Sequence, residues 1–529
     1  MQDFDVIIIG YGPTGKVLAR LLSDAGKSVA IVERWPAAYP LPRAVGYDHE
    51  IKRMMHKLGV AQKIEAVSRP MHHYIWYNAD WKVLIELDQS VESISGGPLG
   101  YLFNQPELEQ ILEEDLLGRP GISLFLSHEA LSVSQNENGA SVVLAPFNGA
   151  DIPVDMAEAK TISARYLVGC DGANSIVRTA MNSEIYDHGF DADWLVVDVI
   201  PNEGTDLPIP DAAQWCNPAR PTTIVPSGVR NRRWEFMVMP GEDLEELARE
   251  EKVWELLSPW ITPKDGKIIR SATYNFRSRL ARGWRKGRFL IAGDAAHLMP
   301  PFMGQGMCSG LRDAWTLGWK LAAVLDERAT ESILDDYETE RSAHVDAVIR
   351  TSMQMGQIVC VPDEAAAAER DAAFFSGKVP PPPAFPGLSG GMIDTDETGA
   401  PIGLAGALMP HSDLSDGTRT VRLDDLRDRP GFVLLVNGLA HDGITPVAAA
   451  AMEALDCLAV PFSPARYSDV SGRLSEMFAE SGAKAVLVRP DFYAFGSAQT
   501  PDQAEAMLVR AARMLTGKDI GATVKATAK

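Results

Sequence analysis

The sequence of 529 residues has little cysteine, and what it has is scattered. Its cysteines are Cys170, Cys216, Cys308, Cys360 and Cys457. An odd number at irregular spacings argues against a disulfide framework, and the lack of a C-x-x-C pair argues against a zinc site or another metal centre. We therefore expect reduced thiols, as in cytoplasmic enzymes.

Long apolar runs and an excess of basic charge are also missing. No stretch of about 18 apolar residues occurs, so no transmembrane helix is predicted. The N-terminus has no basic segment followed by an apolar one, so no secretory signal is predicted. Lysine and arginine number 50 against 71 acidic residues, a net charge of -21 that would repel a nucleic-acid backbone. We expect a cytoplasmic protein that binds neither membrane nor nucleic acid.

A glycine-rich turn stands out near the N-terminus. Residues 5–9 form an apolar, β-branched run that predicts a buried strand of a parallel sheet, and residues 17–25 predict a helix. Between them lies a G-x-G-x-x-G turn, and the next predicted strand, 28–32, ends in an acid that could hold an adenosine ribose. Although a purely structural turn is the alternative, this order predicts a dinucleotide site. Its candidate contacts are Gly10, Gly12, Pro13, Gly15, Glu33 and Arg34.

Two later segments repeat the pattern of a buried strand followed by an acid. Residues 166–170 lead into Asp171 and Gly172, and residues 288–293 lead into Asp294. Each acid taken alone could instead cap a following helix.

The three motifs, in this order, resemble those of the flavoprotein aromatic hydroxylases, the para-hydroxybenzoate hydroxylase superfamily. The stretch 234–242 and the C-terminal layout resemble most closely the 3-(3-hydroxyphenyl)propionate hydroxylases. The resemblance implies bound FAD, with Asp294 accepting a hydrogen bond from a ribityl or ribose hydroxyl. It places Asp171 and Gly172 where FAD and a nicotinamide could touch the backbone, and it assigns Arg43 and Gln105 to the FAD phosphate or ribityl chain. The alternatives for these two are a surface arginine and a glutamine at a helix start.

A proline and glycine stretch after Asp294 leads into an apolar helix. Free N–H groups at such a helix start would stabilise the negative charge of a reduced flavin. A tight helix entry without a ligand is the alternative. The resemblance also places the backbone carbonyl of Pro301 beside the substrate hydroxyl. The candidate flavin contacts here are Pro301, Gly304, Gln305, Gly306 and Met307.

Short strands dominate the segments between these motifs. Residues 73–76, 83–87, 195–200, 222–225 and 234–239 predict a mostly antiparallel sheet that roofs the substrate pocket. Tyr47, Trp215, Phe236 and Met237 are candidate substrate contacts, with ordinary core packing as the alternative.

Polar residues near this sheet have two interpretations. Asp48 could relay a proton from a phenol or could cap the helix predicted at 50–58. Arg230, Arg232 and Arg233 could attract a carboxylate, but a solvated hairpin turn is the preferred interpretation.

The predicted fold is α/β: a Rossmann-like FAD-binding domain with a parallel sheet, an inserted and mostly antiparallel substrate sheet, and a C-terminal thioredoxin-like domain. Cys457 is the only cysteine of that last domain, so dithiol chemistry is not available, and a packing or dimer-forming role is preferred. We predict an FAD-binding domain at 1–70, 100–180 and 272–375, a substrate-binding domain at 71–99 and 181–271, a proline-rich linker at 376–395 and the thioredoxin-like domain at 396–529.

The implied activity is that of an FAD-dependent monooxygenase of aromatic catabolism. NADH or NADPH reduces the FAD, and O2 adds at flavin C4a to give a hydroperoxide that hydroxylates a small phenol. The alternatives are a Baeyer–Villiger or ring-opening oxygenase, a flavin-dependent halogenase, whose W-x-W-x-I-P signature is absent, and a non-catalytic prenyl-GTPase escort protein.

Overall fold

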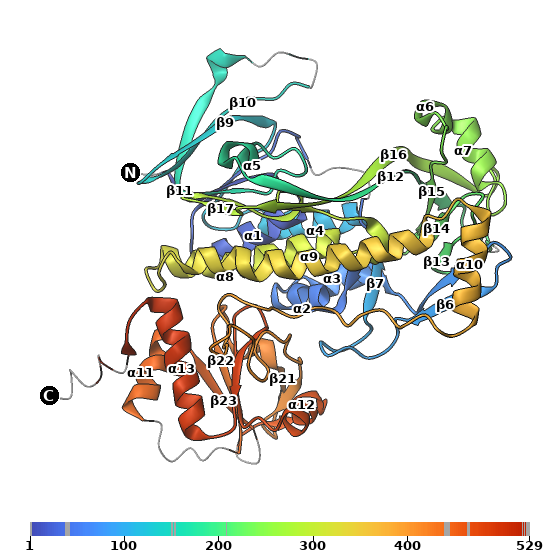
Figure 1. The fold of residues 1–529 in the computed structure, drawn as a ribbon. Coiled ribbons are helices and arrows are strands. Elements are labelled where there is room, and N and C mark those ends of the chain that lie inside the picture. Colours follow the sequence, from blue (N-terminus) through green and yellow to red (C-terminus); the bar gives the residue numbers. More distant parts are fainter. Residues whose placement is uncertain are drawn as a thin grey trace.

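The structure is a computed structural model, and it describes residues 3–37, 43–149, 152, 155–207, 209–438, 445–462, 466–520, 522 and 524. Figure 1 shows two large sheets joined by long strands, with a separate C-terminal domain below them. Helices α8 and α9 run between the first sheet and that domain. Among the described residues no helix is both long and apolar enough to cross a membrane.

The first sheet is built around five parallel strands, β18-β11-β1-β2-β8. Apolar, β-branched sequences form its centre because both faces are covered by helices or by further chain. A hairpin of β9 and β10 and the short β17 extend it. The strands are β1 (Phe4–Ile9), β2 (Val29–Val32), β8 (Ile122–Phe125), β9 (His128–Asn136), β10 (Gly139–Pro146), β11 (Lys160–Gly169), β17 (Arg285–Lys286) and β18 (Phe289–Ile291).

The second sheet has the order β19-β16-β12-β15-β14-β13-β5-β6 and is antiparallel except for the β13–β5 pair. Its strands β12 and β16 are long, and β16 spans the domain boundary predicted at residue 271. The strands are β5 (His73–Tyr77), β6 (Val83–Asp88), β12 (Glu184–Pro201), β13 (Ala213–Trp215), β14 (Thr222–Ser227), β15 (Asn231–Met237), β16 (Gly266–Arg282) and β19 (His297–Leu298).

Helices and a small sheet surround these two sheets. A three-stranded sheet joins β3 (Gly46–Asp48), β7 (Gly100–Phe103) and β4 (Ser68–Pro70). The helices are α1 (Pro13–Asp24), α2 (His49–Lys57), α3 (Ala61–Val67), α4 (Gln105–Leu116), α5 (Ile176–Met181), α6 (Leu244–Leu247), α7 (Glu250–Leu257), α8 (Gly306–Leu325), α9 (Ile333–Val359) and α10 (Glu364–Phe375), with short 3-10 turns η1 (Met156–Glu158), η2 (Gly293–Ala295) and η3 (Pro301–Met303).

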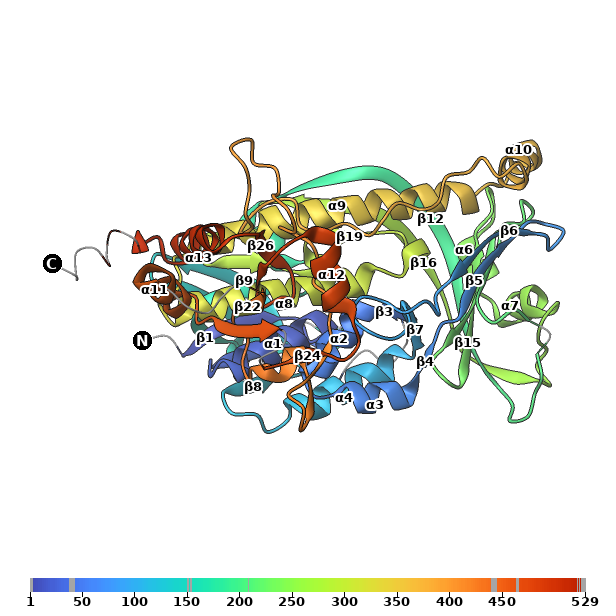
Figure 2. The same ribbon diagram turned by 90° about the horizontal axis from the view of Figure 1, so that it is seen from below.

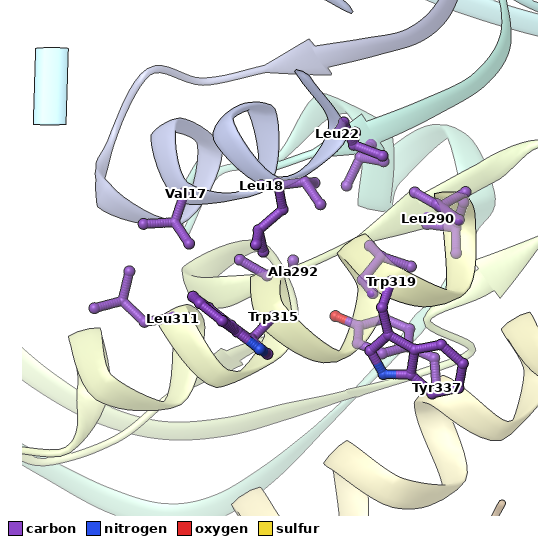
Figure 3. Close-up of a cluster of buried hydrophobic side chains, with 14 of the residues drawn as sticks. Val17, Leu18, Leu22, Leu290, Ala292, Leu311, Trp315, Trp319 and Tyr337 are labelled. Carbon is purple, nitrogen blue, oxygen red and sulfur yellow. The ribbon is translucent and has the colours of Figure 1, made fainter. Parts of the chain in front are cut away.

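The main core lies where α1, α8 and α9 meet the first sheet. Figure 3 shows Leu18 and Leu22 of α1, Trp315 and Trp319 of α8 and Tyr337 of α9 in this buried cluster. All five side chains are buried. The close packing of α1 against α8 fixes the start of each helix, and both starts border the cavity described below.

The C-terminal domain has the strand order β23-β22-β25-β26, in which a parallel βαβ unit precedes an antiparallel hairpin and a helix. This is a thioredoxin-like arrangement, so the predicted fold class is confirmed in each of its three parts. The elements are β20 (Asp413–Ser415), β21 (Thr420–Arg422), η4 (Leu423–Leu426), β22 (Val433–Asn437), α11 (Pro446–Ala454), β23 (Leu458–Phe462), β24 (Ser468–Asp469), α12 (Arg473–Ser481), β25 (Ala485–Val488), β26 (Ala494–Ala498) and α13 (Pro501–Thr516).

Figure 2 shows α11 and α13 at the opposite end of the molecule from strands β5 and β6. The chain between α10 and the C-terminal domain bridges that distance as an extended segment.

Buried ion pairs attach the C-terminal domain to the rest of the chain. Arg489 is completely buried and donates to Glu340 of α9 at 2.8 and 2.7 Å, and to Asp491 at 3.0 and 2.6 Å. The Asp491 carboxylate in turn accepts from Trp319 and Thr316 of α8, each at 3.2 Å. The domain is therefore held by charges that have no access to solvent.

We expect Arg489→Ala to lower the free energy of unfolding by about 3–5 kcal/mol, because two buried carboxylates lose their main partner. Urea unfolding followed by circular dichroism measures this. Arg429→Ala is the control, since Arg429 is 69% exposed in its pair with Asp456 and its loss should cost below about 1 kcal/mol. Equal stability of the two variants would contradict the structural role of Arg489.

Candidate functional site

A cavity of about 1380 Å³ lies at the carboxyl ends of the parallel strands. Ordinary small-molecule pockets measure roughly 300–1,000 Å³, so this one has room for a dinucleotide and a second small molecule. Its wall is continuous from the glycine turn, past the start of α8, to the second sheet, and the C-terminal domain and the segment before it close one side.

The three glycines of the turn have different surroundings. A Cβ atom on Gly10 would lie 2.2 Å from the carbonyl oxygen of Cys170, and one on Gly15 would lie 2.2 Å from the carbonyl oxygen of Gly10. A Cβ on Gly12 would meet nothing within 4 Å, and Gly12 lines the cavity together with Pro13. Two glycines thus serve close backbone packing, while the third leaves open space where a ligand can reach the backbone.

Glu33 and Arg34 lie outside the cavity lining. The Glu33 carboxylate accepts hydrogen bonds from the backbone N–H groups of Tyr11 and Trp35, both at 3.0 Å, and so holds the glycine turn in place. The Arg34 side chain is 55% exposed and stacks over the Trp35 ring. The geometry therefore gives no support to a cofactor contact by Arg34, and the ribose contact of Glu33 stays a prediction.

The Asp171 carboxylate caps the start of a helix. Its Oδ2 accepts from the N–H of Ile176 at 2.8 Å, at the start of α5, while its Oδ1 is buried without a hydrogen-bond partner among the described residues. Burial raises the pKa of this carboxyl. The side chain does not line the cavity, but the neighbouring Cys170, Gly172 and Ala173 do, so this motif faces the cavity beside the capping acid.

Asp294 differs from Asp171 because its carboxylate opens into the cavity. The residue is exposed to the cavity, the surrounding protein desolvates its carboxyl and raises the pKa, and no hydrogen bond among the described residues engages it. No helix begins at His297, which lies in β19, so the alternative role of Asp294 as a cap there is removed. Asp313 fixes the turn: it accepts from the Gly293 N–H at 3.0 Å, and lies 2.7 Å from the His297 imidazole.

Gln105 positions Arg43. Its Oε1 accepts from the backbone N–H groups of Arg43 at 3.0 Å and Ala44 at 2.8 Å, and its amide nitrogen donates to Glu109 at 2.7 Å. The carbonyl of Arg43 accepts from Arg233 at 2.6 Å. Arg43 and Gln105 both line the cavity, with the Arg43 side chain exposed.

The start of α8 faces the cavity. Gly304, with φ +63°, turns the chain, and Gln305 is the N-cap residue before Gly306 and Met307. All four line the cavity, so the first N–H groups of a 20-residue helix point toward it. The Pro301 carbonyl accepts from the Gly304 N–H at 2.8 Å, which closes the turn, and Pro301 also lines the cavity.

Arg312 is the centre of a buried network below this helix start. It donates to Asp48 Oδ2 at 2.6 Å, to Glu50 at 2.6 Å and to Gln305 Oε1 at 3.0 Å. Its guanidinium also lies 4.9 Å from the ring centre of Phe385, in the segment that leads to the C-terminal domain. The Tyr493 hydroxyl of that domain donates to Glu50 at 3.3 Å. One guanidinium therefore joins four parts of the chain.

Asp48 is a cap and an ion-pair partner. Its Oδ1 accepts from the N–H groups of Glu50 and Ile51 at the start of α2, and its Oδ2 accepts from Arg312 and Gln305. Burial alone would raise the pKa of Asp48, but the Arg312 guanidinium brings it below the ordinary value. A carboxylate that is ionised and fully hydrogen-bonded is a poor proton relay, so the geometry favours the capping interpretation.

Aromatic side chains line the other end of the cavity. Tyr74, Trp76, Tyr274 and Phe276 come from the second sheet, and Phe302 comes from η3. Buried Tyr47 lies on the small sheet, also lines the cavity, and stacks on Tyr101 at 5.2 Å. These rings make an apolar surface suited to a flat aromatic ligand.

Three predicted substrate contacts lie elsewhere. Trp215 stacks on Trp81 with ring centres 4.9 Å apart, and Phe236 is buried in a cluster with Trp234 and Trp260. Met237 packs against a buried cluster that includes Trp76 and Phe302. None of the three lines the cavity, so core packing, the alternative weighed for them, accounts for their position. An alternating strand pattern shows that a residue is buried, but it does not show which face of the sheet meets the ligand.

The hairpin arginines were also predicted incorrectly in part. Arg230 is exposed, as a solvated turn requires, but Arg233 is 1% exposed, lines the cavity and pairs with Asp198.

Sequence reasoning missed Arg312, Asp313 and Tyr493 entirely. The available signal was a pair of adjacent charges, 312 and 313, in a helix whose only other charge is Lys320, which indicates buried ion pairs.

Two family models match the chain. One, described as an FAD binding domain, matches residues 3–352, and the other, described as the HcaD C-terminal domain, matches residues 406–513. The first covers more than half of the chain and includes the glycine turn, Asp294 and the start of α8.

Curated relatives extend the match over nearly the whole chain. A protein of Rhodococcus jostii (strain RHA1) named probable NADH-specific resorcinol 4-hydroxylase is 36% identical over 506 residues, which are 94% of this chain and 92% of the relative. A 3-(3-hydroxy-phenyl)propionate/3-hydroxycinnamic acid hydroxylase of Comamonas testosteroni is 36% identical over 384 residues, 72% of this chain and 63% of the relative.

Solved structures share the fold. Aklavinone-11 hydroxylase, in its complex with FAD and aklavinone, has a TM-score of 0.78 at 23% identity, with 97% of this chain and 99% of that chain covered. The flavin-dependent monooxygenase PieE, in complex with FAD and substrate, has a TM-score of 0.79 at 20% identity, with 97% and 100% covered. With an open glycine cradle, a free carboxylate and a helix start on one cavity, the chain belongs to the family of FAD-dependent aromatic hydroxylases.

Proposed function

We propose that this enzyme uses NADH and O2 to hydroxylate a small dihydric phenol of the resorcinol type. The observation that carries the proposal is the continuity of one cavity, which joins Gly12, Asp294 and the start of α8 to an aromatic end on the second sheet. The 36% identical relative named an NADH-specific resorcinol 4-hydroxylase supports both the reductant and the substrate.

We propose the following FAD contacts. The pyrophosphate would approach Gly12 and Pro13 at the start of α1, Arg43 would face a phosphate, and Asp294 would accept from a ribityl or ribose hydroxyl. The N–H groups from Gly304 to Met307 would face the flavin ring. These residues fit the cofactor, because Gly12 leaves open space and Asp294 leaves an unused acceptor on the same cavity.

When bound, FAD supplies hydride acceptance and oxygen transfer to the ring. The chain supplies charge, orientation and a dry environment. The start of α8 stabilises negative charge in front of it, and the aromatic wall holds a ring flat and excludes water. Pro301 places a carbonyl on the same wall, where it can accept from a phenol hydroxyl in addition to the Gly304 N–H.

We also propose the domain division predicted from the sequence, with the first sheet serving FAD and the second serving the substrate. Wall residues from the C-terminal domain and the segment before it, such as Phe385, Leu408 and Tyr493, support a role for that domain in closing the cavity. The predicted dimer stays a prediction, which sedimentation equilibrium would test.

The glycine turn offers a sharp test of FAD binding. In Gly12→Ala the new methyl group meets no protein atom and φ is −76°, so the stability of the apoprotein should change by less than about 0.5 kcal/mol. The methyl would block the backbone approach of the pyrophosphate, so the Kd for FAD should rise at least about tenfold. Fluorescence titration of the apoprotein with FAD measures this.

Gly15→Ala is the matched control, because its methyl would collide with the Gly10 carbonyl and destabilise the folded apoprotein itself. An unchanged Kd for FAD in a folded Gly12→Ala protein would contradict the proposed cradle.

The activity itself is tested with a panel of phenols. We expect resorcinol to stimulate NADH oxidation by the FAD-loaded enzyme, with a trihydroxybenzene identified by NMR and mass spectrometry. Hydroxyphenylpropionates, hydroxybenzoates and hydroxypyridines complete the panel. A ring-opened or lactone product would favour the oxygen-insertion alternative, a halide requirement would favour the halogenase, and a colourless protein that cannot be reconstituted with FAD would favour the binding-only alternative.

A further inference from the structure

A buried carboxylate on the second sheet has no partner at hydrogen-bond distance among the described residues. Glu235 of β15 is 8% exposed and lines the cavity. Among the described residues, Glu235 forms one ion pair, with Nη1 of Arg233 at 3.7 Å. None of the described residues donates a hydrogen bond to Glu235. A buried ionisable group without a hydrogen bond is costly, so a carboxylate of this kind that faces a cavity is placed to accept a hydrogen bond from a bound molecule.

The charges around Glu235 compensate it without hydrogen bonding to it. Asp198 of β12 is fully buried and accepts from Arg233 at 2.8 and 2.9 Å, and from Arg270 of β16 at 3.4 Å. The four groups carry two positive and two negative charges when Glu235 is ionised. Arg233 donates to Asp198 and to the carbonyl of Arg43, so these N–H groups are directed to partners other than Glu235.

The neighbours of Glu235 on the cavity wall suit a phenol ring. Thr223 lies opposite it in the register of β14 and β15, and its hydroxyl donates to Gln214 at 2.7 Å. Tyr74 of β5 donates to the same amide oxygen at 3.4 Å and lies close enough to interact electrostatically with Glu235. The hydroxyls of Thr223 and Tyr74 are thus directed to Gln214, which leaves the carboxylate as the free acceptor among aromatic side chains.

We propose that the Glu235 carboxylate accepts a hydrogen bond from the second hydroxyl group of a dihydric phenol and so determines the substrate class of this enzyme. The inference rests on the proposed function. A charge-assisted hydrogen bond in a water-poor pocket favours a ring with a hydroxyl at this position over a ring with an ether or an alkyl group there. A ring substituent with its own negative charge is repelled by the same carboxylate.

The test compares resorcinol with 3-methoxyphenol, which keeps one phenol group but has no second donor. In Glu235→Gln, which preserves shape and removes the charge, the KM for resorcinol should rise about tenfold, while the KM for 3-methoxyphenol should change less than about twofold. Kd values, from the absorbance change of oxidised enzyme-bound FAD, should move in parallel. Glu245→Gln on α6 is the matched control, since Glu245 is exposed and is not among the residues that line the cavity.

The pH dependence provides a second readout. Burial raises the pKa of Glu235, with Arg233 and Arg270 opposing and Asp198 reinforcing the shift, and Tyr74 faces it from β5. The acceptor is complete above this pKa and is lost as the pH falls through it. The Kd for resorcinol should therefore rise at lower pH in the natural enzyme and not in Glu235→Gln.

The outcomes separate the two claims. If no phenol stimulates NADH oxidation, the proposed function fails, and the Kd comparison still decides the role of Glu235. If resorcinol is hydroxylated but Glu235→Gln weakens the binding of resorcinol and 3-methoxyphenol equally, the inference is overturned while the proposed function stands. The same holds if the substitution weakens the binding of neither phenol.

Discussion

The buried guanidinium of Arg312 holds together the parts of the chain that enclose the cavity. It bonds to Asp48 and Glu50 at the start of α2 and to Gln305 at the start of α8, and it packs on Phe385 in the segment before the C-terminal domain. A buried cation of this kind requires all of its partners, since the loss of any one of them leaves a buried charge with neither a partner nor solvent. The position of the α8 start, which the flavin ring would face, is therefore set by electrostatics as well as by packing.

The C-terminal domain extends the same principle. It has a thioredoxin-like strand order but only one cysteine, so it lacks the thiol pair that dithiol chemistry needs. Tyr493 reaches Glu50 in the Arg312 network, and Arg489 closes a second buried network with Glu340 of α9. Both networks anchor the domain on α8 and α9, the helices that also pack against the first sheet. The domain is thus built into the wall of the cavity.

The sequence predicted the fold well because its signals are local. Buried β-branched strands, the glycine turn and the acids after strands are each contained within about ten residues, and Gly12, Asp294 and the start of α8 do face one cavity. The wall of the substrate end was predicted poorly, as Trp215 shows, because its members are set by contacts between distant residues. Tyr493 and Glu50 lie 443 positions apart, and no pattern in either neighbourhood encodes their hydrogen bond.

The central claim is that one cavity holds the flavin and the phenol side by side. A crystal structure of the enzyme with FAD and resorcinol tests it most directly. The account predicts the pyrophosphate against Gly12, the flavin ring facing residues 304–307, and resorcinol among Tyr74, Trp76 and Phe276, with a hydroxyl at the Glu235 carboxylate. A dinucleotide bound elsewhere, or a phenol outside this aromatic wall, would contradict it.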